Sequence, residues 1–149
     1  MNAPARVDST PRLEDFPYRL TDNVRFADLD PNQHVNNAVY LNYLEYARME
    51  FLKDSGFDYG AFTRKGYGLI VARIRIDYRQ PAYTYDRLTV ETTSIKRRRT
   101  SGIFRQVVLK DGAVVADAEV TWATVNSEGR PCPLPEGFDL PALEPREED

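Results

Sequence analysis

The feature that most constrains the fold of this 149-residue chain is a single change in its hydrophobic period. Residues 37–54 contain no Gly or Pro, and apolar side chains recur in them at helical spacing, at Tyr40, Leu44, Ala47 and Phe51. Asn36 is a suitable N-cap for a helix that begins there, and Gly56 is a suitable stop. The pattern therefore predicts one long helix over residues 37–54.

After a connection that contains Gly and Tyr, the hydrophobic period becomes two. In residues 70–79 one face of the predicted strand carries Ile70, Ala72, Ile74, Ile76 and Tyr78, and the other carries Val71, Arg73, Arg75, Asp77 and Arg79. Further strands are expected at residues 18–26, 86–98, 102–110 and 114–126. The dipeptide Asp111-Gly112 is a strong hairpin signal between the last two.

One helix and about five strands, four of them consecutive, predict an α+β protein whose antiparallel sheet packs on the helix. A single helix cannot cover both faces of such a sheet, and at least one sheet edge also needs cover. We therefore expect a homodimer or a homotetramer.

Both ends of the chain are rich in proline and in charged residues. Residues 1–15 are expected to form a flexible N-terminal arm. Residues 131–149 hold five prolines and end on Arg146-Glu147-Glu148-Asp149, so an extended, solvated, acidic tail is expected there. The folded domain is predicted to span residues 16–130.

The distribution of charge limits the partners of the chain. Its formal net charge is −3, yet residues 64–110 hold twelve basic and three acidic side chains. An acidic protein with one basic block is not expected to coat nucleic acid or an anionic membrane. No stretch approaches the roughly 18 apolar residues that cross a bilayer, and the N-terminal residues lack the apolar core of a signal peptide. We expect a cytoplasmic protein.

Scarce residues exclude several kinds of site. Cys132 and His34 are the single cysteine and the single histidine of the chain. An internal disulfide, a site with several cysteines and any motif with two histidines are therefore impossible within one chain. We expect no metal and no cofactor.

Residues with useful chemistry gather in the turn before the helix, at Asp30, Asn32 and His34. The backbone N–H groups of residues 36–39 have no acceptor inside the helix and carry the positive end of its macrodipole. Asp30 could act as general base or nucleophile on a carbonyl whose oxygen these N–H groups hold. The same residue types also suit an ordinary turn and a helix cap, and a lone histidine there also suits a structural role.

The segment DLDPNQHVNNAVYLNYLEYAR resembles the motif of the hotdog-fold 4-hydroxybenzoyl-CoA thioesterase and acyl-CoA thioester hydrolase family. The resemblance implies a hotdog fold, an antiparallel sheet wrapped around one long helix, and hydrolysis of an acyl thioester. It also implies a catalytic role for Asp30, and a backbone N–H at Asn37 that polarises the thioester carbonyl. The string is similar, too, to the D-x-N-x-H segment of acyl-ACP thioesterases, in which Asp30, Asn32 and His34 are implicated.

Two departures from these families bear on the site. The bacterial CoA enzymes commonly carry Gly where this chain has Gln33, a difference that concerns the turn geometry and the space beside the thioester. The acyl-ACP enzymes use a Cys and a Glu on a later strand, and residues 95–101 contain neither, which favours the mechanism centred on Asp30. Among the basic side chains, Arg97, Arg98 and Arg99 are candidates for binding the phosphates of coenzyme A or an acidic acyl carrier protein.

Two other functions remain open from the sequence. A hotdog protein could instead hydrate or dehydrate an acyl thioester, which relies on a His together with an acidic residue. The chain could also be a non-enzymatic binder of acyl thioesters, or of single-stranded nucleic acid through its basic strand. The acyl group, the choice between coenzyme A and carrier protein, and the choice between a general base and an anhydride mechanism stay undetermined at this point.

Overall fold

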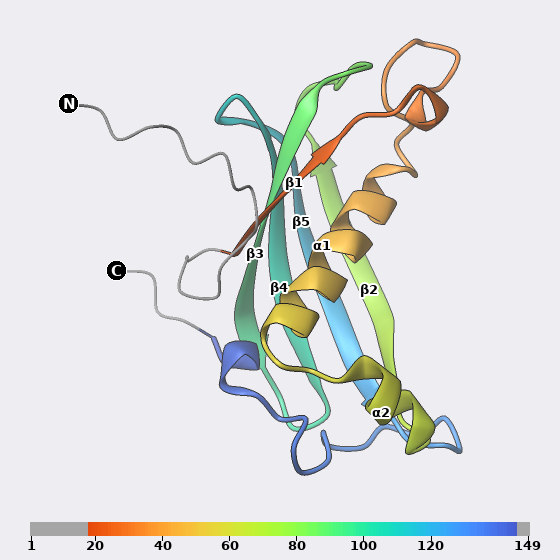
Figure 1. The fold of residues 1–149 in the computed structure, drawn as a ribbon, viewed down its shortest axis with the longest axis vertical. Coiled ribbons are helices and arrows are strands. Elements are labelled where there is room, and N and C mark those ends of the chain that lie inside the picture. Colours follow the sequence, from red (N-terminus) through yellow and green to blue (C-terminus); the bar gives the residue numbers. More distant parts are fainter. Residues whose placement is uncertain (1–17, 146–149) are drawn as a thin grey trace, which may run out of the picture.

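The computed structural model describes residues 18–145, and within them the predicted α+β architecture is confirmed (Figure 1). Its strands are β1 (Tyr18–Asn23), β2 (Gly68–Tyr78), β3 (Arg87–Arg97), β4 (Ser101–Lys110) and β5 (Ala113–Val125). Its α-helices are α1 (Tyr40–Asp54) and α2 (Tyr59–Arg64), and two 3-10 turns cover Phe26–Asp28 and Pro141–Leu143. None of the helices within residues 18–145 is long and apolar enough to cross a membrane.

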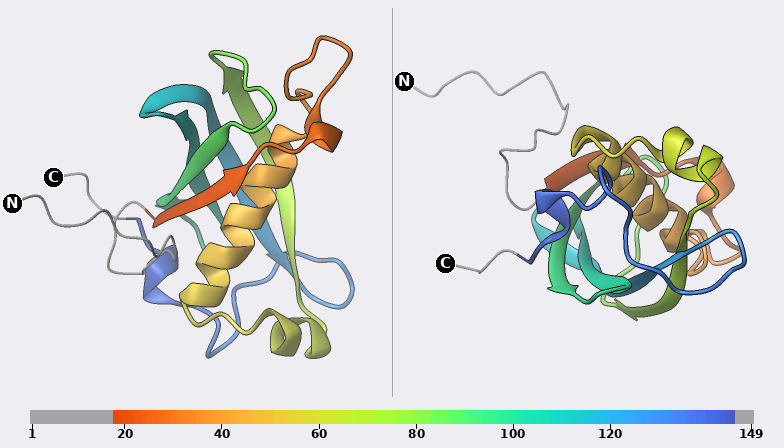
Figure 2. Two further views of the ribbon diagram at one scale, coloured as in Figure 1. Left: turned by 45° about the horizontal axis from the view of Figure 1, so that its top comes forward. Right: turned by 90° about the horizontal axis from the view of Figure 1, so that it is seen from below.

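The five strands form one antiparallel sheet in the order β1-β3-β4-β5-β2, which curves around α1 (Figure 2). The core lies between the sheet and the helix. The strands contribute alternate buried residues, among them Val90, Thr92, Phe104, Gln106, Val108, Val120 and Trp122. The helix contributes the predicted stripe of Tyr40, Leu44, Ala47 and Phe51. This burial of the helical stripe against alternate strand positions explains why the two hydrophobic periods are readable in the sequence.

The predicted start of the long helix was three residues too early. Residues 37–39 form a turn, in which the Asn36 side chain accepts a hydrogen bond from the Ala38 N–H at 2.9 Å. The N-cap position of α1 is Val39, whose backbone is already helical. Asn36 therefore caps the turn that leads into α1 rather than the helix itself. The predicted stop at Gly56 is confirmed, since this residue has a φ of 91° and its N–H donates to the Lys53 carbonyl.

The connection after α1 contains the short helix α2, which the sequence analysis took for a loop. The Asp58 side chain accepts a hydrogen bond from the Ala61 N–H at 3.0 Å and so caps this helix. Phe62 is fully buried and stacks on Tyr67, with ring centroids 5.5 Å apart. This short helix therefore adds one buried aromatic ring to the core.

The predicted faces of β2 need a correction, because the strand contains a β-bulge. Its register with β5 passes from Val71 opposite Trp122 to Arg73 opposite Thr121, which leaves Ala72 as an extra residue. Opposite residues of an antiparallel pair point to the same face. Val71 therefore faces the core side together with Ile74, whereas strict alternation had placed these two residues on opposite faces.

The prediction of a solvated tail from residue 131 onward is wrong for residues 131–145. Leu134, Phe138 and Leu143 are buried in the core, and the Leu143 carbonyl accepts a hydrogen bond from Ser94 Oγ at 2.6 Å. The prolines space these apolar residues along an irregular segment that closes one end of the molecule (Figure 2). Residues 146–149 and the predicted arm of residues 1–15 lie outside the described residues.

Candidate active site

The loop between β1 and α1 is held by backbone hydrogen bonds at both of its sides. The Asp30 N–H donates to the His34 carbonyl at 3.0 Å, and the Asp30 carbonyl accepts from the Gln33 N–H at 3.0 Å. The Val35 N–H donates to the Ala82 carbonyl at 2.8 Å, which ties the loop to the segment after β2. The loop is thus a compact turn with few free backbone groups, suited to fixing the side chains it carries.

Gln33 occupies the position that departs from the family motif. Its φ is 66°, a left-handed conformation that glycine adopts more readily than a residue with a Cβ. The turn therefore keeps a backbone geometry typical of glycine although the residue is Gln. The side chain of Gln33 is exposed, so it does not fill the space beside Asp30.

The Asp30 carboxylate is fixed from two directions. Its Oδ1 accepts a hydrogen bond from the Asn32 N–H at 2.8 Å, and its Oδ2 lies 3.7 Å from His34 Nδ1. The Asp30 side chain is only 15% exposed, whereas that of His34 is 37% exposed. Asn32 contributes its backbone to this arrangement, while the residue as a whole is exposed. The structure thus brings Asp30, Asn32 and His34 together.

A cavity of about 430 Å³ lies between this loop, the start of α1 and the end of β2. Its lining consists of Asp30, His34, Val35, Asn37, Tyr40, Tyr78, Arg79, Gln80 and Pro81. Two of the predicted catalytic residues besides Asp30, namely His34 and Asn37, therefore border the same space. Asn32 does not line it, and its contact to the site is the hydrogen bond to Asp30.

The backbone N–H of Asn37 is the free donor at the helix start. The neighbouring N–H groups are engaged, since that of Asn36 donates to the Asp28 carbonyl and that of Ala38 to the Asn36 side chain. Within residues 18–145 the Asn37 N–H has no acceptor. A free N–H at the start of a helix, bordering a cavity that also holds a carboxylate, is suited to bind a carbonyl oxygen that gains negative charge.

Two tyrosines form one wall of the cavity. Tyr40 and Tyr78 meet edge to face, with ring centroids 5.4 Å apart, and the Tyr78 hydroxyl donates to the Asn37 carbonyl at 2.7 Å. Burial raises the pKa of both phenols, so both stay protonated at neutral pH. The hydrogen bond from Tyr78 fixes the carbonyl of Asn37, in the peptide that directly follows the free N–H, beside the cavity.

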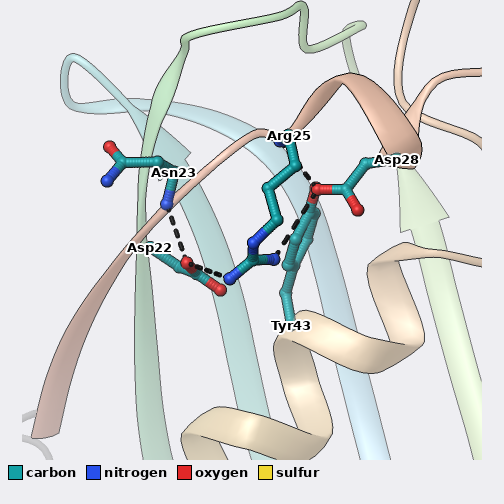
Figure 3. A network of polar contacts seen from close by, with 5 residues as sticks. All are labelled: Asp22, Asn23, Arg25, Asp28 and Tyr43. Carbon is teal, nitrogen blue, oxygen red and sulfur yellow. Dashed lines mark hydrogen bonds and ion pairs between the residues drawn. The ribbon is translucent and has the colours of Figure 1, made fainter.

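Asp28, two residues before Asp30, belongs to a different network (Figure 3). Its Oδ2 accepts hydrogen bonds from the Tyr43 hydroxyl at 2.6 Å and from the Arg25 N–H at 2.9 Å. The Arg25 guanidinium lies 3.8 Å from the same oxygen and donates to Asp22 at 3.1 Å. Burial, with the hydrogen bond to Asp28, raises the pKa of Tyr43. Asp28 therefore attaches the start of the loop to α1.

The predicted CoA-binding arginines lie at the other end of the sheet. Arg87, at the start of β3, pairs with Asn23 near the loop, whereas Arg97 ends that strand about 33 Å away at the usual rise per residue. The Arg97 side chain is 11% exposed, donates to Asp139 at 3.0 Å and lies over the Trp122 ring. Arg98 and Arg99 are exposed. Within one protomer, none of the three borders the Asp30 cavity.

Sequence reasoning missed the contribution of residues 78–81 to the cavity. Gln80-Pro81 was interpreted only as the end of a strand, and Arg79 only as part of a charged strand face. The link between this segment and the loop is the hydrogen bond from the Val35 N–H to the Ala82 carbonyl, which spans distant parts of the chain. No local sequence pattern predicts such a contact.

An antiparallel sheet of five strands wrapped around one long helix defines a hotdog fold. The model of the thioesterase-like superfamily matches residues 24–140, and the chain belongs to that superfamily. The sequence prediction of a hotdog-fold thioester hydrolase is thereby confirmed.

Individual relatives agree with this membership. The long-chain acyl-CoA thioesterase FadM of Escherichia coli is 39% identical over 69% of this chain and 79% of its own length. The acyl-CoA thioester hydrolase YbgC of Escherichia coli is 29% identical over 69% of this chain and 78% of its own. A thioesterase of Thermus thermophilus complexed with coenzyme A and zinc is 33% identical, with a TM-score of 0.72 over 83% of this chain and 95% of its own.

Proposed function

We propose that the chain hydrolyses acyl-CoA thioesters in the cavity between the β1–α1 loop, α1 and the end of β2. The observation that carries this proposal is the joint placement of the Asp30 carboxylate and the free Asn37 N–H on one cavity. Related chains named as acyl-CoA thioesterases supply the class of substrate.

In this proposal each group has a role during hydrolysis. The thioester oxygen accepts a hydrogen bond from the Asn37 N–H, which stabilises the charge that develops on it. In one route, Asp30 takes a proton from water while the water oxygen bonds to the thioester carbon; the C–S bond then breaks and the sulfur receives that proton. In the other route, a carboxylate oxygen of Asp30 bonds to the thioester carbon and the C–S bond breaks to give an anhydride and a thiolate; water then hydrolyses the anhydride to the free acid and the Asp30 carboxylate, and a proton released by the water neutralises the thiolate. Both routes use the Asp30 carboxylate.

His34 and Asn32 act on Asp30 rather than on the substrate in this proposal. The Asn32 N–H holds one carboxylate oxygen, and His34 Nδ1 lies 3.7 Å from the other. They therefore aim the carboxylate at the cavity. For coenzyme A, Arg79 is the cation that borders the cavity in the same protomer, and we propose it as a phosphate contact beside the predicted Arg98 and Arg99.

A thiol-release assay over a panel of acyl-CoA thioesters, with short, long and aromatic acyl groups, tests the proposed reaction. We expect free coenzyme A and free acid in equal amounts from at least one member. An enoyl-CoA in the same panel covers the alternative of hydration. Loss of the double bond without release of thiol would contradict hydrolysis as the reaction of this site.

We also propose that the chain acts as a homo-oligomer built through β2. This strand is an edge of the sheet, spans Gly68–Tyr78, and exposes Ile70 and Val71 by 47% and 46%. An exposed edge strand with apolar side chains in its first half favours pairing with another strand, and a second copy of β2 can supply it antiparallel. Light scattering during size-exclusion chromatography should give at least twice the chain mass of 17.1 kDa. A mass of one chain would contradict the proposal.

The cytoplasmic location stays a prediction from the sequence.

A further inference from the structure

The last residue of β2, Tyr78, forms a contact to the segment that leads into α1. The strand ends at the same end of the molecule at which α1 begins (Figure 1). Tyr78 lies opposite the buried Ala116 of β5, so its side chain is on the core-facing side of the sheet. Its ring meets the buried ring of Tyr40, and its hydroxyl donates to the Asn37 carbonyl at 2.7 Å. Within residues 18–145, no other side chain of β2 forms a hydrogen bond to the loop between β1 and α1.

The peptide that joins Asn37 to Ala38 is held at both of its polar groups. Its carbonyl accepts the hydrogen bond from Tyr78, and its N–H donates to Asn36 Oδ1 at 2.9 Å. The preceding peptide carries the free Asn37 N–H, and its carbonyl, on Asn36, accepts from the Val39 N–H at 2.9 Å. Each peptide is planar, so the relative orientation of two neighbouring peptides depends only on φ and ψ of the residue between them. Hydrogen bonds to both peptides therefore fix the direction of the Asn37 N–H.

The hydrogen bonds inside this turn are local, whereas the one from Tyr78 is long-range. The bonds from Ala38 and Val39 to Asn36 join residues that are close neighbours in the chain. Asn37 and Ala38 are exposed, so side-chain packing does little to hold the turn. The Tyr78 hydroxyl belongs to a residue 41 positions further along the chain, on a strand paired with β5. In the described part of the chain, it is the one side chain outside the turn that bonds to either peptide, and it ties the turn to the sheet.

We infer that Tyr78 is a positioning residue for hydrolysis, which holds the Asn37 N–H in the direction that the thioester oxygen needs as it gains charge. This inference rests on the proposed function. A donor to such an oxygen is effective when it is already aimed before the reaction, so that no reorganisation is needed. Misplacement by about 1 Å can slow a reaction about a hundredfold. Tyr78 acts through the backbone of Asn37 and bonds to no reacting atom.

Such a role changes kcat more than KM. The oxygen of a bound thioester carries little charge, and it gains charge only as the carbonyl carbon is attacked. A misdirected Asn37 N–H therefore weakens the transition state more than the bound substrate, which lowers kcat without an equal change in KM. A purely structural role of the Tyr78 hydroxyl would instead lower thermal stability and leave kcat of the folded protein unchanged.

Tyr78→Phe removes the hydroxyl and keeps the ring that meets Tyr40. With an acyl-CoA that the unaltered protein hydrolyses, we expect kcat to fall about tenfold and KM to change less than about twofold. The matched control is Tyr83→Phe, because Tyr78 and Tyr83 are each 47% exposed. The Tyr83 hydroxyl forms no hydrogen bond within residues 18–145, so this control should keep both constants. Thermal unfolding of each variant confirms that it is folded at the assay temperature. An unchanged kcat in Tyr78→Phe, or a loss that lies in KM alone, would overturn the inference.

A second variant acts on the same peptide from outside the cavity. Asn36 does not line the Asp30 cavity, and Asn36→Ala removes the acceptor of the Ala38 N–H. We expect kcat to fall here too, and to return in Asn36→Ser, whose hydroxyl can accept the same bond. Because Tyr78 and Asn36 hold one peptide, the double variant with Tyr78→Phe should be little slower than the slower single variant. Effects on kcat that multiply would mean that the Tyr78 hydroxyl acts on the substrate directly, and would overturn the inference.

Failure of the proposed function would look different from failure of this inference. In the first case the unaltered protein releases no thiol from any acyl-CoA. In the second case the unaltered protein hydrolyses its substrate, and Tyr78→Phe does so with the same kcat.

Discussion

Asp28 and Asp30 are separated by one residue, yet their surroundings differ completely. Asp28 has its Oδ2 occupied by the Tyr43 hydroxyl and by the Arg25 N–H, whereas Asp30 keeps one oxygen toward His34 and borders a cavity. The hydrogen bonds of the Asp28 carboxylate hold the loop to α1, whereas Asp30 lines a cavity that a ligand can enter. The sequence resemblance implies a catalytic role for the second Asp, and this role stays a prediction, which the different surroundings of the two carboxylates support.

Replacement of Tyr43 by Phe tests the structural role of Asp28. The change removes the 2.6 Å hydrogen bond and leaves a partly buried carboxylate oxygen with one partner fewer. We expect the free energy of unfolding to fall by about 1–3 kcal/mol, as for other hydrogen bonds to charged groups. Urea denaturation measures the change. The matched control is Y46F on the same helix, whose ring is 46% exposed and which should change stability little.

At the scale of elements, the strands and the long helix follow from pattern alone, and the exceptions have identifiable causes. The bulge at Ala72 moves Val71 to the core-facing side without any local signal in the sequence. Asp30, Asn32 and His34 were placed near one another because they lie close in the chain. Tyr78 and Arg79 joined the site through contacts between distant parts of the chain, from Val35 to Ala82 and from Tyr78 to Asn37, which sequence periodicity does not encode.

The C-terminal segment was misread because proline and charge dominate its composition. Phe138 is 7% exposed and its ring lies 5.5 Å from Phe57 and 5.3 Å from Phe62. We expect Phe138→Ala to lower the free energy of unfolding by about 3 kcal/mol, the usual range for a buried phenylalanine. Chemical denaturation measures this change, and Glu136→Ala, which alters an exposed neighbour, is the matched control. Equal stability of the two variants would mean that the segment does not belong to the core.

An ion pair between β4 and β5, formed by Arg105 and Asp117, predicts that the free energy of unfolding depends on pH. The hydrogen bond from Arg105 lowers the pKa of Asp117, and the two side chains are 2.9 Å apart. A carboxyl with a depressed folded-state pKa adds stability above its unfolded pKa of about 3.9, and this stability is lost as the pH falls through the folded pKa. Asp117→Asn should therefore destabilise the protein at pH 7 and flatten its loss of stability below about pH 4. The effect should be modest and smaller at high salt, because both groups are partly exposed. Thermal unfolding of both proteins from pH 3 to pH 7 tests this.

At the scale of the whole molecule, the uneven cover of the sheet connects assembly with function. The helix lies mainly against β3 and β1, whereas the β2 side carries a free edge of the sheet and the Asp30 cavity. A second copy paired along β2 would cover that edge beside the cavity, which joins the proposed oligomer to the proposed site of hydrolysis. The basic block of residues 64–110 is divided by this arrangement, with Arg79 at the Asp30 cavity and Arg97 at the opposite end of the sheet.

The central claim is that Asp30 carries the hydrolysis, and one substitution tests it directly. Asp30→Asn keeps the size of the side chain and the acceptor for the Asn32 N–H but removes the base and nucleophile. With an acyl-CoA that the unaltered protein hydrolyses, we expect thiol release to fall by at least a hundredfold at unchanged thermal stability, in keeping with the usual contribution of a catalytic base. The control Asp111→Asn, in the exposed turn between β4 and β5, should retain full activity. Thiol release by Asp30→Asn at the rate of the unaltered protein would contradict the account.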